Sequence, residues 1–255
     1  MRQVNSISEL ERQQVALART RGEDFRSDAI RRLVADRIKP GTVLDVGCGA
    51  GGLVAWLLTH GYDARGIDFS APIVAAAQEH LRGCGLEPTR IRKASADSLV
   101  QQGERADNIV SMDCLEHIED DSSAFASLVS AVYPGGRLII TVPAMPSLFG
   151  AKDRAIGHYR RYTPERLEAL ASPHPLRVEE LKYWNLLGVV PTFVAVRLLN
   201  RAVDESFRYG EPGAGKRALR RGLAAWFRGV ENHLTPPVGL TLLMVATVLG
   251  EKENG

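Results

Sequence analysis

The chain has 255 residues, enough for a single α/β domain with a large buried core. Its 32 lysines and arginines nearly balance its 30 aspartates and glutamates, so charge gives no reason to expect nucleic acid as a partner. The three cysteines lack the paired spacing of a metal site and are typical of a reducing compartment. The first 40 residues are charged and contain no apolar core of a secretion signal, so we expect a cytoplasmic protein.

Two charged helices are predicted at the N-terminus, over residues 8–20 and 26–38. The first opens with a capping box at Ser8 and Glu11, and the second carries apolar residues on one face. We expect residues 1–39 to cover one side of a binding site. The alternative, that they only cap the edge of a sheet, stays open.

A strand, a sharp turn and a helix are predicted over residues 42–58. Residues 42–46 are apolar or β-branched, a glycine run follows over 47–52, and residues 53–58 are apolar. Glycine adopts backbone angles that other residues avoid and lets a ligand lie close to the main chain. The start of the helix behind the turn favours a carboxylate or a phosphate.

Two kinds of ligand fit this turn. Gly47, Gly49 and Gly52 satisfy the dinucleotide pattern G-x-G-x-x-G. Asp45, however, lies two residues before the first glycine, where it would repel a pyrophosphate and attract an ammonium group. A sulfonium amino acid carries such an ammonium group, so Asp45 favours that ligand.

Asp45, Gly47, Gly49 and Gly51 resemble the first motif of the class I S-adenosylmethionine-dependent methyltransferases, an acidic residue followed by G-x-G-x-G. The resemblance is specific over about residues 40–142 and looser to residue 250. It implies S-adenosyl-L-methionine as cofactor, S-adenosyl-L-homocysteine as product, and cofactor contacts from these four residues and Cys48.

A second strand is predicted over residues 62–69 and ends with Asp68 and Phe69. Asp68 follows Asp45 by 23 residues, close to the interval at which doubly wound folds place a carboxylate on ribose hydroxyls. In the resembling family the matching acidic residue holds the ribose, so we expect Asp68 and its neighbour Phe69 in the cofactor site. The alternative is a helix N-cap, which Ser70 could supply as readily.

A third strand is predicted over residues 91–96, after a helix over 73–82, and Ala96, Asp97 and Ser98 stand at its end. By resemblance, Asp97 accepts a hydrogen bond from the adenine amino group and the Ser98 N–H meets a ring nitrogen. The alternative for Asp97 is a solvated turn aspartate.

A fourth strand over residues 107–112 is followed by Asp113, Glu116 and His117, then by a helix over 122–131 and a fifth strand over 137–142. Ligands of open parallel sheets lie beyond the carboxyl ends of the strands, so Asp113 is expected to contact the cofactor. The alternation of strands and helices predicts a doubly wound, mostly parallel sheet with helices on both faces. The resemblance implies a Rossmann-like, seven-stranded sheet whose last strand is antiparallel.

Five polar or aromatic residues precede a helix near position 163 and are too crowded for an idle loop. We expect His158 and Tyr159 in catalysis and Arg160, Arg161 and Tyr162 in substrate binding, since arginine suits a carboxylate or phosphate. The alternative is a plain N-cap with solvated arginines.

His117 and His158 are the candidate general bases that would deprotonate an acceptor hydroxyl. A second interpretation groups Asp113, Glu116, His117 and His158 as ligands for Mg²⁺. That set is similar to the E-x-x-E-H pattern, with a distant histidine, of ubiquinone-pathway and small-RNA 2′-O-methyltransferases, with Asp113 in place of glutamate. A third is that Glu116 and His117 only cap the helix and line the pocket.

The C-terminal third is predicted to hold a sixth strand over residues 176–183 and a final buried strand within 239–250, which is antiparallel in the family. The apolar run 186–199 is too short and interrupted to span a membrane. Residues 197–228 are rich in arginine and resemble a basic amphipathic helix, which could lie on a membrane surface or form a solvated lid.

We therefore predict one methyltransferase domain that methylates a hydroxyl of an amphiphilic or anionic small molecule. The alternatives are C- or N-methylation of a secondary metabolite or isoprenoid-type substrate, a nicotinamide-dependent oxidoreductase, and a non-catalytic cofactor-binding module. The predicted parts are a helical cover over 1–39, a cofactor-binding core over 40–142, a substrate loop and helix over 143–175, an inserted helical cap over 184–235 and a final strand over 236–250.

Overall fold

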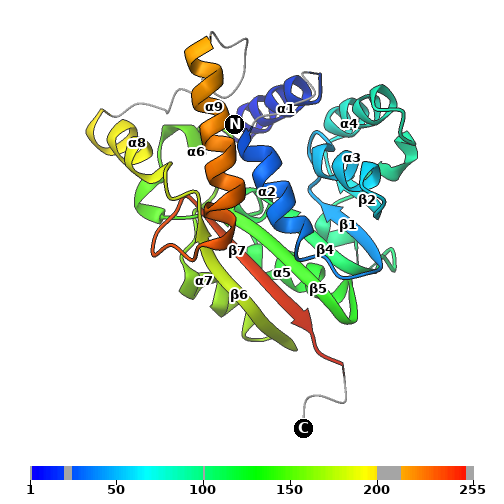
Figure 1. The fold of residues 1–255 in the computed structure, drawn as a ribbon. Coiled ribbons are helices and arrows are strands. Elements are labelled where there is room, and N and C mark those ends of the chain that lie inside the picture. Colours follow the sequence, from blue (N-terminus) through cyan, green and yellow to red (C-terminus); the bar gives the residue numbers. More distant parts are fainter. Residues whose placement is uncertain (1, 20–24, 100, 200–213, 251–255) are drawn as a thin grey trace.

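Seven strands form one mixed sheet in the computed structural model, which describes residues 2–19, 25–99, 101–199 and 214–250 (Figure 1). The strand order is β3-β2-β1-β4-β5-β7-β6. The strands are β1 Thr42–Val46, β2 Asp63–Asp68, β3 Ile91–Lys93, β4 Ala106–Met112, β5 Val132–Pro143, β6 Leu176–Trp184 and β7 Thr241–Val248. Strands β1 to β5 pair in parallel, whereas β7 runs antiparallel to β5 and β6. The predicted fold is confirmed.

Helices cover both faces of this sheet (Figure 1). The α-helices are α1 Arg2–Arg19, α2 Phe25–Ala35, α3 Gly52–Thr59, α4 Ala71–Gly83, α5 Asp121–Ser130, α6 Ala151–Ala155, α7 Pro164–Ala171, α8 Val189–Phe193 and α9 Ala214–Gly229. The short 3₁₀ helices are Pro88–Arg90, Ala96–Ser98, Leu115–His117, Pro146–Leu148 and Glu231–His233, and Val194–Leu198 forms a π-helix.

The core is divided by the pleat of the sheet, because successive strand residues point to opposite faces. Leu44 and Ile109 pack on one face with residues of α5 and α7. Val43 and Val110 pack on the other face with residues of α2, α3 and α9. All eight residues of β7 are buried, which is why its sequence is apolar at nearly every position and does not alternate.

The N-terminal cover differs in its start from the prediction. Helix α1 begins at Arg2, so Ser8 lies inside the helix and the capping box at Ser8 and Glu11 is wrong. Glu11 instead accepts a hydrogen bond of 2.6 Å from the Ser70 hydroxyl at the start of α4. This contact places α1 over the carboxyl ends of the first strands.

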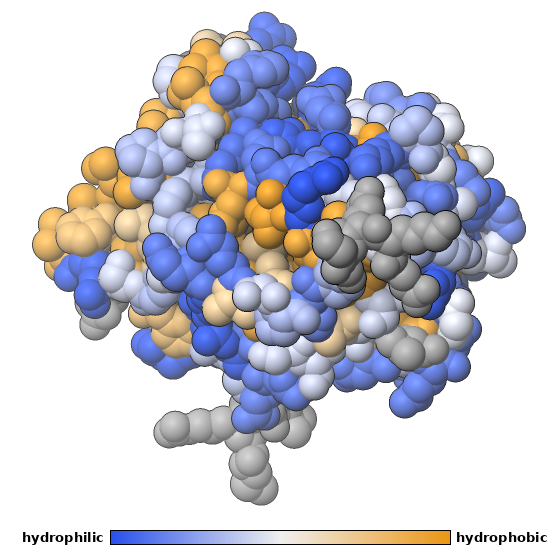
Figure 2. All heavy atoms as spheres, turned by 90° about the horizontal axis from the view of Figure 1, so that it is seen from below, coloured by the Kyte–Doolittle hydropathy of each residue, from blue (hydrophilic) through white to orange (hydrophobic). Residues whose placement is uncertain are grey.

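The insertion between β6 and β7 contains α8, the π-helix, α9 and the last 3₁₀ helix. Residues 200–213 of the arginine-rich segment lie outside the described residues. The outer side of α8 is apolar and exposed, with Val190 at 70% and Leu198 of the π-helix at 68%; Figure 2 shows apolar side chains gathered at the left margin, over α8. No helix of the described residues is long and apolar enough to cross a membrane.

We expect Asn108→Ala to lower the free energy of unfolding by about 2–4 kcal/mol, measured by urea denaturation. The fully buried Asn108 amide of β4 accepts from Lys39 N at 2.9 Å and donates to the carbonyls of Lys39 and Thr42 at 3.0 and 3.2 Å, so its loss removes this partner from three half-buried main-chain groups. The exposed helix residue Ser122→Ala is the control. A loss within the error of that control would contradict the role of Asn108.

Candidate functional site

The glycine turn joins β1 to α3 and lies at the carboxyl end of β1, between β2 and β4 in the sheet. Gly47, Gly49 and Gly51 have φ angles of 77°, 52° and 73°, which side chains disfavour. A Cβ on Gly51 would also lie 2.6 Å from Ile91, whereas one on Gly52 would meet no atom within 4 Å. The backbone therefore needs the G-x-G-x-G glycines and does not need Gly52, on which the dinucleotide pattern depends.

Asp45 of β1 lies beside this turn, lines a cavity of about 280 Å³ and is only 3% exposed. Burial, with a smaller contribution from the nearby Asp68, raises the pKa of its carboxyl to about 7. A cationic ammonium group in the cavity would stabilise the ionised form. Cys48 lines the same cavity, and burial raises the pKa of its thiol, so it contributes shape and not charge.

Asp68 ends β2 and bridges to the glycine turn. Its carboxylate accepts hydrogen bonds from the N–H groups of Gly49, at 3.1 Å, and of Ser70, at 3.0 Å. Ser70 supplies the N-cap of α4, since its hydroxyl accepts from Ile73 N at 3.4 Å. The cap alternative therefore belongs to Ser70, and Asp68 is left at the position expected for a ribose contact.

The remaining predicted cofactor contacts lie at the ends of β2 and β3. Phe69 is 48% exposed and Asp97 is also exposed, whereas Ala96 is buried. The Ser98 N–H donates to Ser95 O at 3.1 Å, so an adenine ring would have to share or replace that bond. Neither of the two cavities described here is lined by these residues, and their adenine roles stay predictions.

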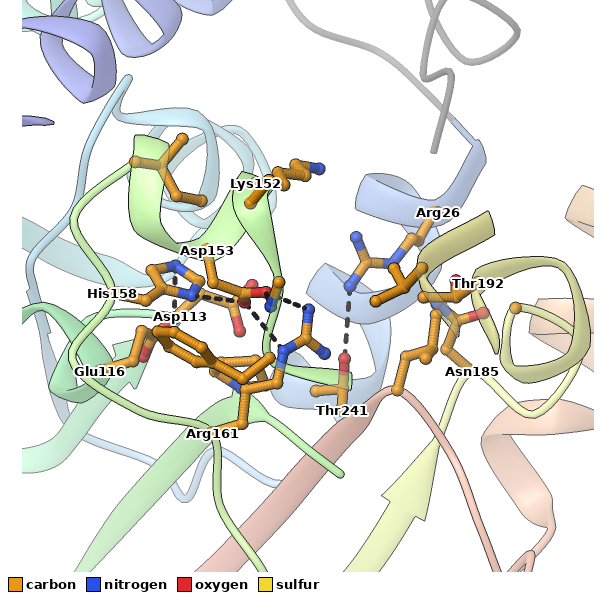
Figure 3. Close-up of a pocket in the computed structure, with 18 of the residues that line it drawn as sticks. Arg26, Asp113, Glu116, Lys152, Asp153, His158, Arg161, Asn185, Thr192 and Thr241 are labelled. Atoms are coloured by element: carbon orange, nitrogen blue, oxygen red, sulfur yellow. Dashed lines mark hydrogen bonds and ion pairs between the residues drawn. The ribbon is translucent and has the colours of Figure 1, made fainter. Parts of the chain in front are cut away.

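A larger cavity of about 710 Å³ adjoins the first (Figure 3). Gln14 of α1, Arg26 of α2 and Asp113 after β4 line both cavities. Gln14 also accepts a hydrogen bond of 3.1 Å from Ala50 N of the glycine turn. Residues of both N-terminal helices therefore line the cavities, and the two cavities meet beside Asp113. That residues 1–39 act as a cover stays a prediction.

An acid and two histidines lie at one end of the larger cavity. Glu116 is fully buried, and neither carboxyl oxygen has a hydrogen-bond partner among the described residues. Burial, followed by the charge of Asp113, raises the pKa of Glu116 well above its ordinary value. His158 Nε2 lies 3.8 Å from a Glu116 oxygen. The rings of His117 and His158 pack edge to face, with their centroids 4.6 Å apart.

Asp153 of α6 orients His158, a role that the sequence did not suggest. Its carboxylate lies 3.0 Å from His158 Nδ1 and accepts from the Arg161 Nε at 2.8 Å. Burial acts to raise the pKa of Asp153, but the hydrogen bonds from His158 and Arg161 outweigh it and lower that pKa to about 2. An ionised Asp153 favours the tautomer with Nδ1–H, which leaves Nε2 to accept a proton.

Residues 17–187, about two thirds of the chain, match the sequence profile of a family described as "Methyltransferase domain". The chain belongs to this methyltransferase family. The predicted family and its cofactor, S-adenosylmethionine, are confirmed, and the nicotinamide alternative is removed.

Two relatives illustrate the sequence match of this methyltransferase. A ubiquinone biosynthesis O-methyltransferase of Methylococcus capsulatus is 39% identical over 100 residues, which cover 38% of this chain and 41% of that protein. Phosphoethanolamine N-methyltransferase 2 of Caenorhabditis elegans is 36% identical over 108 residues, which cover 41% of this chain and 24% of that protein. The match thus spans less than half the length of either relative.

Solved structures at lower identity share the fold alone. The [4+2]-cyclase SpnF superposes with a TM-score of 0.60 at 21% identity, over 98% of this chain and 97% of that one. A geranyl diphosphate methyltransferase in complex with S-adenosylmethionine superposes with a TM-score of 0.57 at 14% identity, over 87% of this chain and 85% of that one. Since SpnF is named as a cyclase, a shared fold does not identify the reaction or the acceptor.

Three residues of the loop over 158–162 do not line the larger cavity: Tyr159, Arg160 and Tyr162. Their contacts hold the loop in place. Tyr162 is fully buried and its hydroxyl donates to Asp121 at 3.0 Å, and Arg160 pairs with the same carboxylate at 3.2 Å. Tyr159 is 39% exposed, and the central guanidinium carbon of Arg160 lies 5.6 Å from the centroid of its ring. These contacts give no support to the predicted substrate binding by Arg160 and Tyr162 or to catalysis by Tyr159. Arg161 does line the cavity.

The predicted metal set is only partly gathered. Glu116, His117 and His158 each offer one ligand atom within 4.8 Å of the others, and Asp113 is not in this group. Two imidazoles and one carboxylate suit a transition-metal ion better than Mg²⁺, which prefers oxygen. The residues as arranged do not fit Mg²⁺.

We expect the affinity for S-adenosylhomocysteine to fall about tenfold between about pH 8 and about pH 6, measured by calorimetry. The carboxylate of Asp45 attracts the ammonium group, and below its pKa of about 7 that carboxylate is protonated and the attraction is lost. Asp45→Asn should bind more weakly and without this pH dependence. A variant that keeps the pH dependence would assign it to another group, such as Asp68.

We also expect dialysis against EDTA to leave both the melting temperature and the affinity for S-adenosylhomocysteine unchanged, because the cluster offers two imidazoles and one carboxylate and not the oxygen ligands that Mg²⁺ prefers. Adding back Mg²⁺ should not raise the melting temperature. A rise with Mg²⁺ that disappears in Glu116→Gln would establish a magnesium site.

Proposed function

We propose that this protein transfers the methyl group of S-adenosylmethionine to a hydroxyl of a small amphiphilic or anionic acceptor. One observation carries the proposal: the cavity beside Asp45 meets the cavity beside His158 at Asp113. A methyl group held in the first would face an acceptor held in the second. Such alignment is the main source of rate in a displacement of this kind.

His158 is the proposed general base. Its Nδ1 is held by Asp153, and its Nε2 lies at the larger cavity near Glu116. As the acceptor oxygen bonds to the methyl carbon and the carbon–sulfur bond breaks, the hydroxyl proton passes to Nε2. This leaves the methyl ether and S-adenosylhomocysteine. A positioned base contributes about 10²- to 10⁴-fold to such a step.

His117 is the weaker candidate for this role. Burial, followed by the charge of His158, lowers the pKa of its ring to about 4. At neutral pH it is therefore uncharged but a poor proton acceptor. Its edge-to-face contact with His158 fits a residue that positions the base and shields it from water.

The acceptor class rests on the cavity lining and on the relatives. The walls combine apolar side chains, such as Phe149 and Leu187, with charged ones, such as Arg161. The similarity to a ubiquinone O-methyltransferase supports oxygen as the acceptor atom, whereas the phosphoethanolamine enzyme keeps nitrogen open. Contact of the arginine-rich segment 197–228 with a membrane surface stays a prediction.

We expect His158→Gln to lower kcat by about 10²- to 10⁴-fold and to leave the affinity for S-adenosylhomocysteine unchanged. Asp153→Asn should lower kcat less, because it removes the carboxylate that orients His158 through Nδ1. Acceptors are found by mass spectrometry, from trideuteriomethyl label transferred into a metabolite extract, and fragmentation locates the label on oxygen, nitrogen or carbon. The exposed His233→Gln is the control.

Full activity of His158→Gln would remove it as the base. Label found only on nitrogen or carbon would contradict the hydroxyl acceptor and leave the methyltransferase assignment intact.

A further inference from the structure

Four polar side chains line the larger cavity on the side away from the histidines. They come from separate elements: Arg26 of α2, Asn185 after β6, Thr192 of α8 and Thr241 of β7. Figure 3 shows them together on one side, with Glu116 and His158 on the other. The chain thus brings a second set of polar groups to the cavity, which the proposed chemistry does not use.

The Asn185 amide is fixed but has no hydrogen-bond partner among the described residues, although the residue is only 7% exposed. Its φ of 68° is in the left-handed region, and its neighbours are held: Trp184 Nε1 donates to Asn232 at 2.9 Å, and Leu186 N to Glu231 at 2.9 Å. Asparagine adopts this backbone conformation readily, so the held backbone sets the direction of the side chain. Because Asn185 lines the cavity, the hydrogen-bonding groups of its amide are open to a ligand there.

Thr192 adds a second group of this kind. It is 8% exposed and lies one turn beyond Gly188, whose carbonyl accepts from Thr192 N at 3.1 Å. Its hydroxyl also forms no hydrogen bond within the described part of the chain. Gly188 lets the two side chains approach, since a Cβ there would lie 2.7 Å from the Asn185 amide oxygen.

Arg26 supplies positive charge beside them. Its guanidinium lies 5.6 Å from the Trp184 ring centroid and donates to the Thr241 hydroxyl at 3.3 Å. The charged residues that line the cavity are the cations Arg26, Lys152, Arg154, Arg161 and Arg197 and the acids Asp113, Glu116 and Asp153. The acids belong to the histidine end, where Asp153 is paired with Arg161. Arg26 is therefore the labelled charge beside Asn185 in Figure 3, and the nearby Glu231 carboxylate is engaged by Leu186 N and Trp226 Nε1.

We propose that Arg26, Asn185 and Thr192 form a subsite for a carboxylate of the methyl acceptor. The Asn185 Nδ2–H and the Thr192 hydroxyl would donate to its oxygens, and Arg26 would balance its charge. This inference rests on the proposed function only in assigning the carboxylate to the acceptor. It implies an acceptor with an acid at one end and a hydroxyl, directed at His158, at the other.

The test measures binding to the complex with S-adenosylhomocysteine by ligand-observed NMR. The probes are hydroxyaryl and hydroxyalkyl carboxylates, each paired with its uncharged carboxamide. We expect at least one acid to bind at least tenfold more tightly than its carboxamide. Equal binding of the acids and their carboxamides, or no binding by any acid, would overturn the subsite.

Two variants locate the preference. Asn185→Asp should weaken acid binding at least tenfold and leave the carboxamide unaffected, because it sets a second carboxylate against the ligand. In Asn185→Gly, glycine tolerates the left-handed backbone and only the side-chain amide is lost. This variant should weaken binding of the acid by a smaller factor. Gln101→Glu adds the same charge on an exposed turn and is the control. Unchanged affinity for S-adenosylhomocysteine confirms folding, and an acid preference that survives both Asn185 variants overturns the proposal.

The readouts separate this subsite from the proposed function. An acid that binds through Asn185 but is never methylated would refute the proposed reaction and leave the subsite standing. Methylation of acid and carboxamide with the same KM would leave the reaction intact and remove the subsite.

Discussion

Two buried carboxylates beside a left-handed glycine turn define the cofactor side of this structure. Asp45 lies one residue before the end of β1, Asp68 ends the neighbouring parallel strand β2, and burial raises the pKa of both carboxyls. Main-chain N–H groups of Gly49 and Ser70 partly compensate Asp68, whereas Asp45 accepts no hydrogen bond from the part of the chain that the structure describes. A cationic ligand relieves that imbalance, so the glycines and the cofactor class meet one electrostatic requirement.

The acceptor side is built from elements that the parallel core does not need. Helix α6 carries Asp153, the 3₁₀ helix after β4 carries Glu116 and His117, and the loop before α7 carries His158. Their contacts cross between these elements, from Asp153 to both His158 and Arg161. The position of His158, the proposed base, therefore depends on three segments folding against one another.

Much of the fold could be predicted because its signals are local. The strands over 42–46 and 107–112, the glycine turn and the antiparallel last strand follow from apolar patterns, turn residues and family resemblance. The loop over 158–162 could not be assigned in the same way. Polarity there suggested substrate binding, but Asp121 is buried nearby and engages Tyr162 and Arg160. Asp153 was missed because a single acid in a Lys-Asp-Arg run has no local mark of its later partner.

The insertion that carries Asn185 and Thr192 leaves the sheet at Trp184 and returns at Thr241, two residues paired across β6 and β7. Its two ends are therefore joined by the sheet itself, like the ends of a hairpin loop. The length of the insertion can change without separating β6 from β7, provided that Phe227 of α9 keeps its place in the core. The proposed carboxylate subsite and the cofactor turn thus lie on parts of the chain that can vary separately.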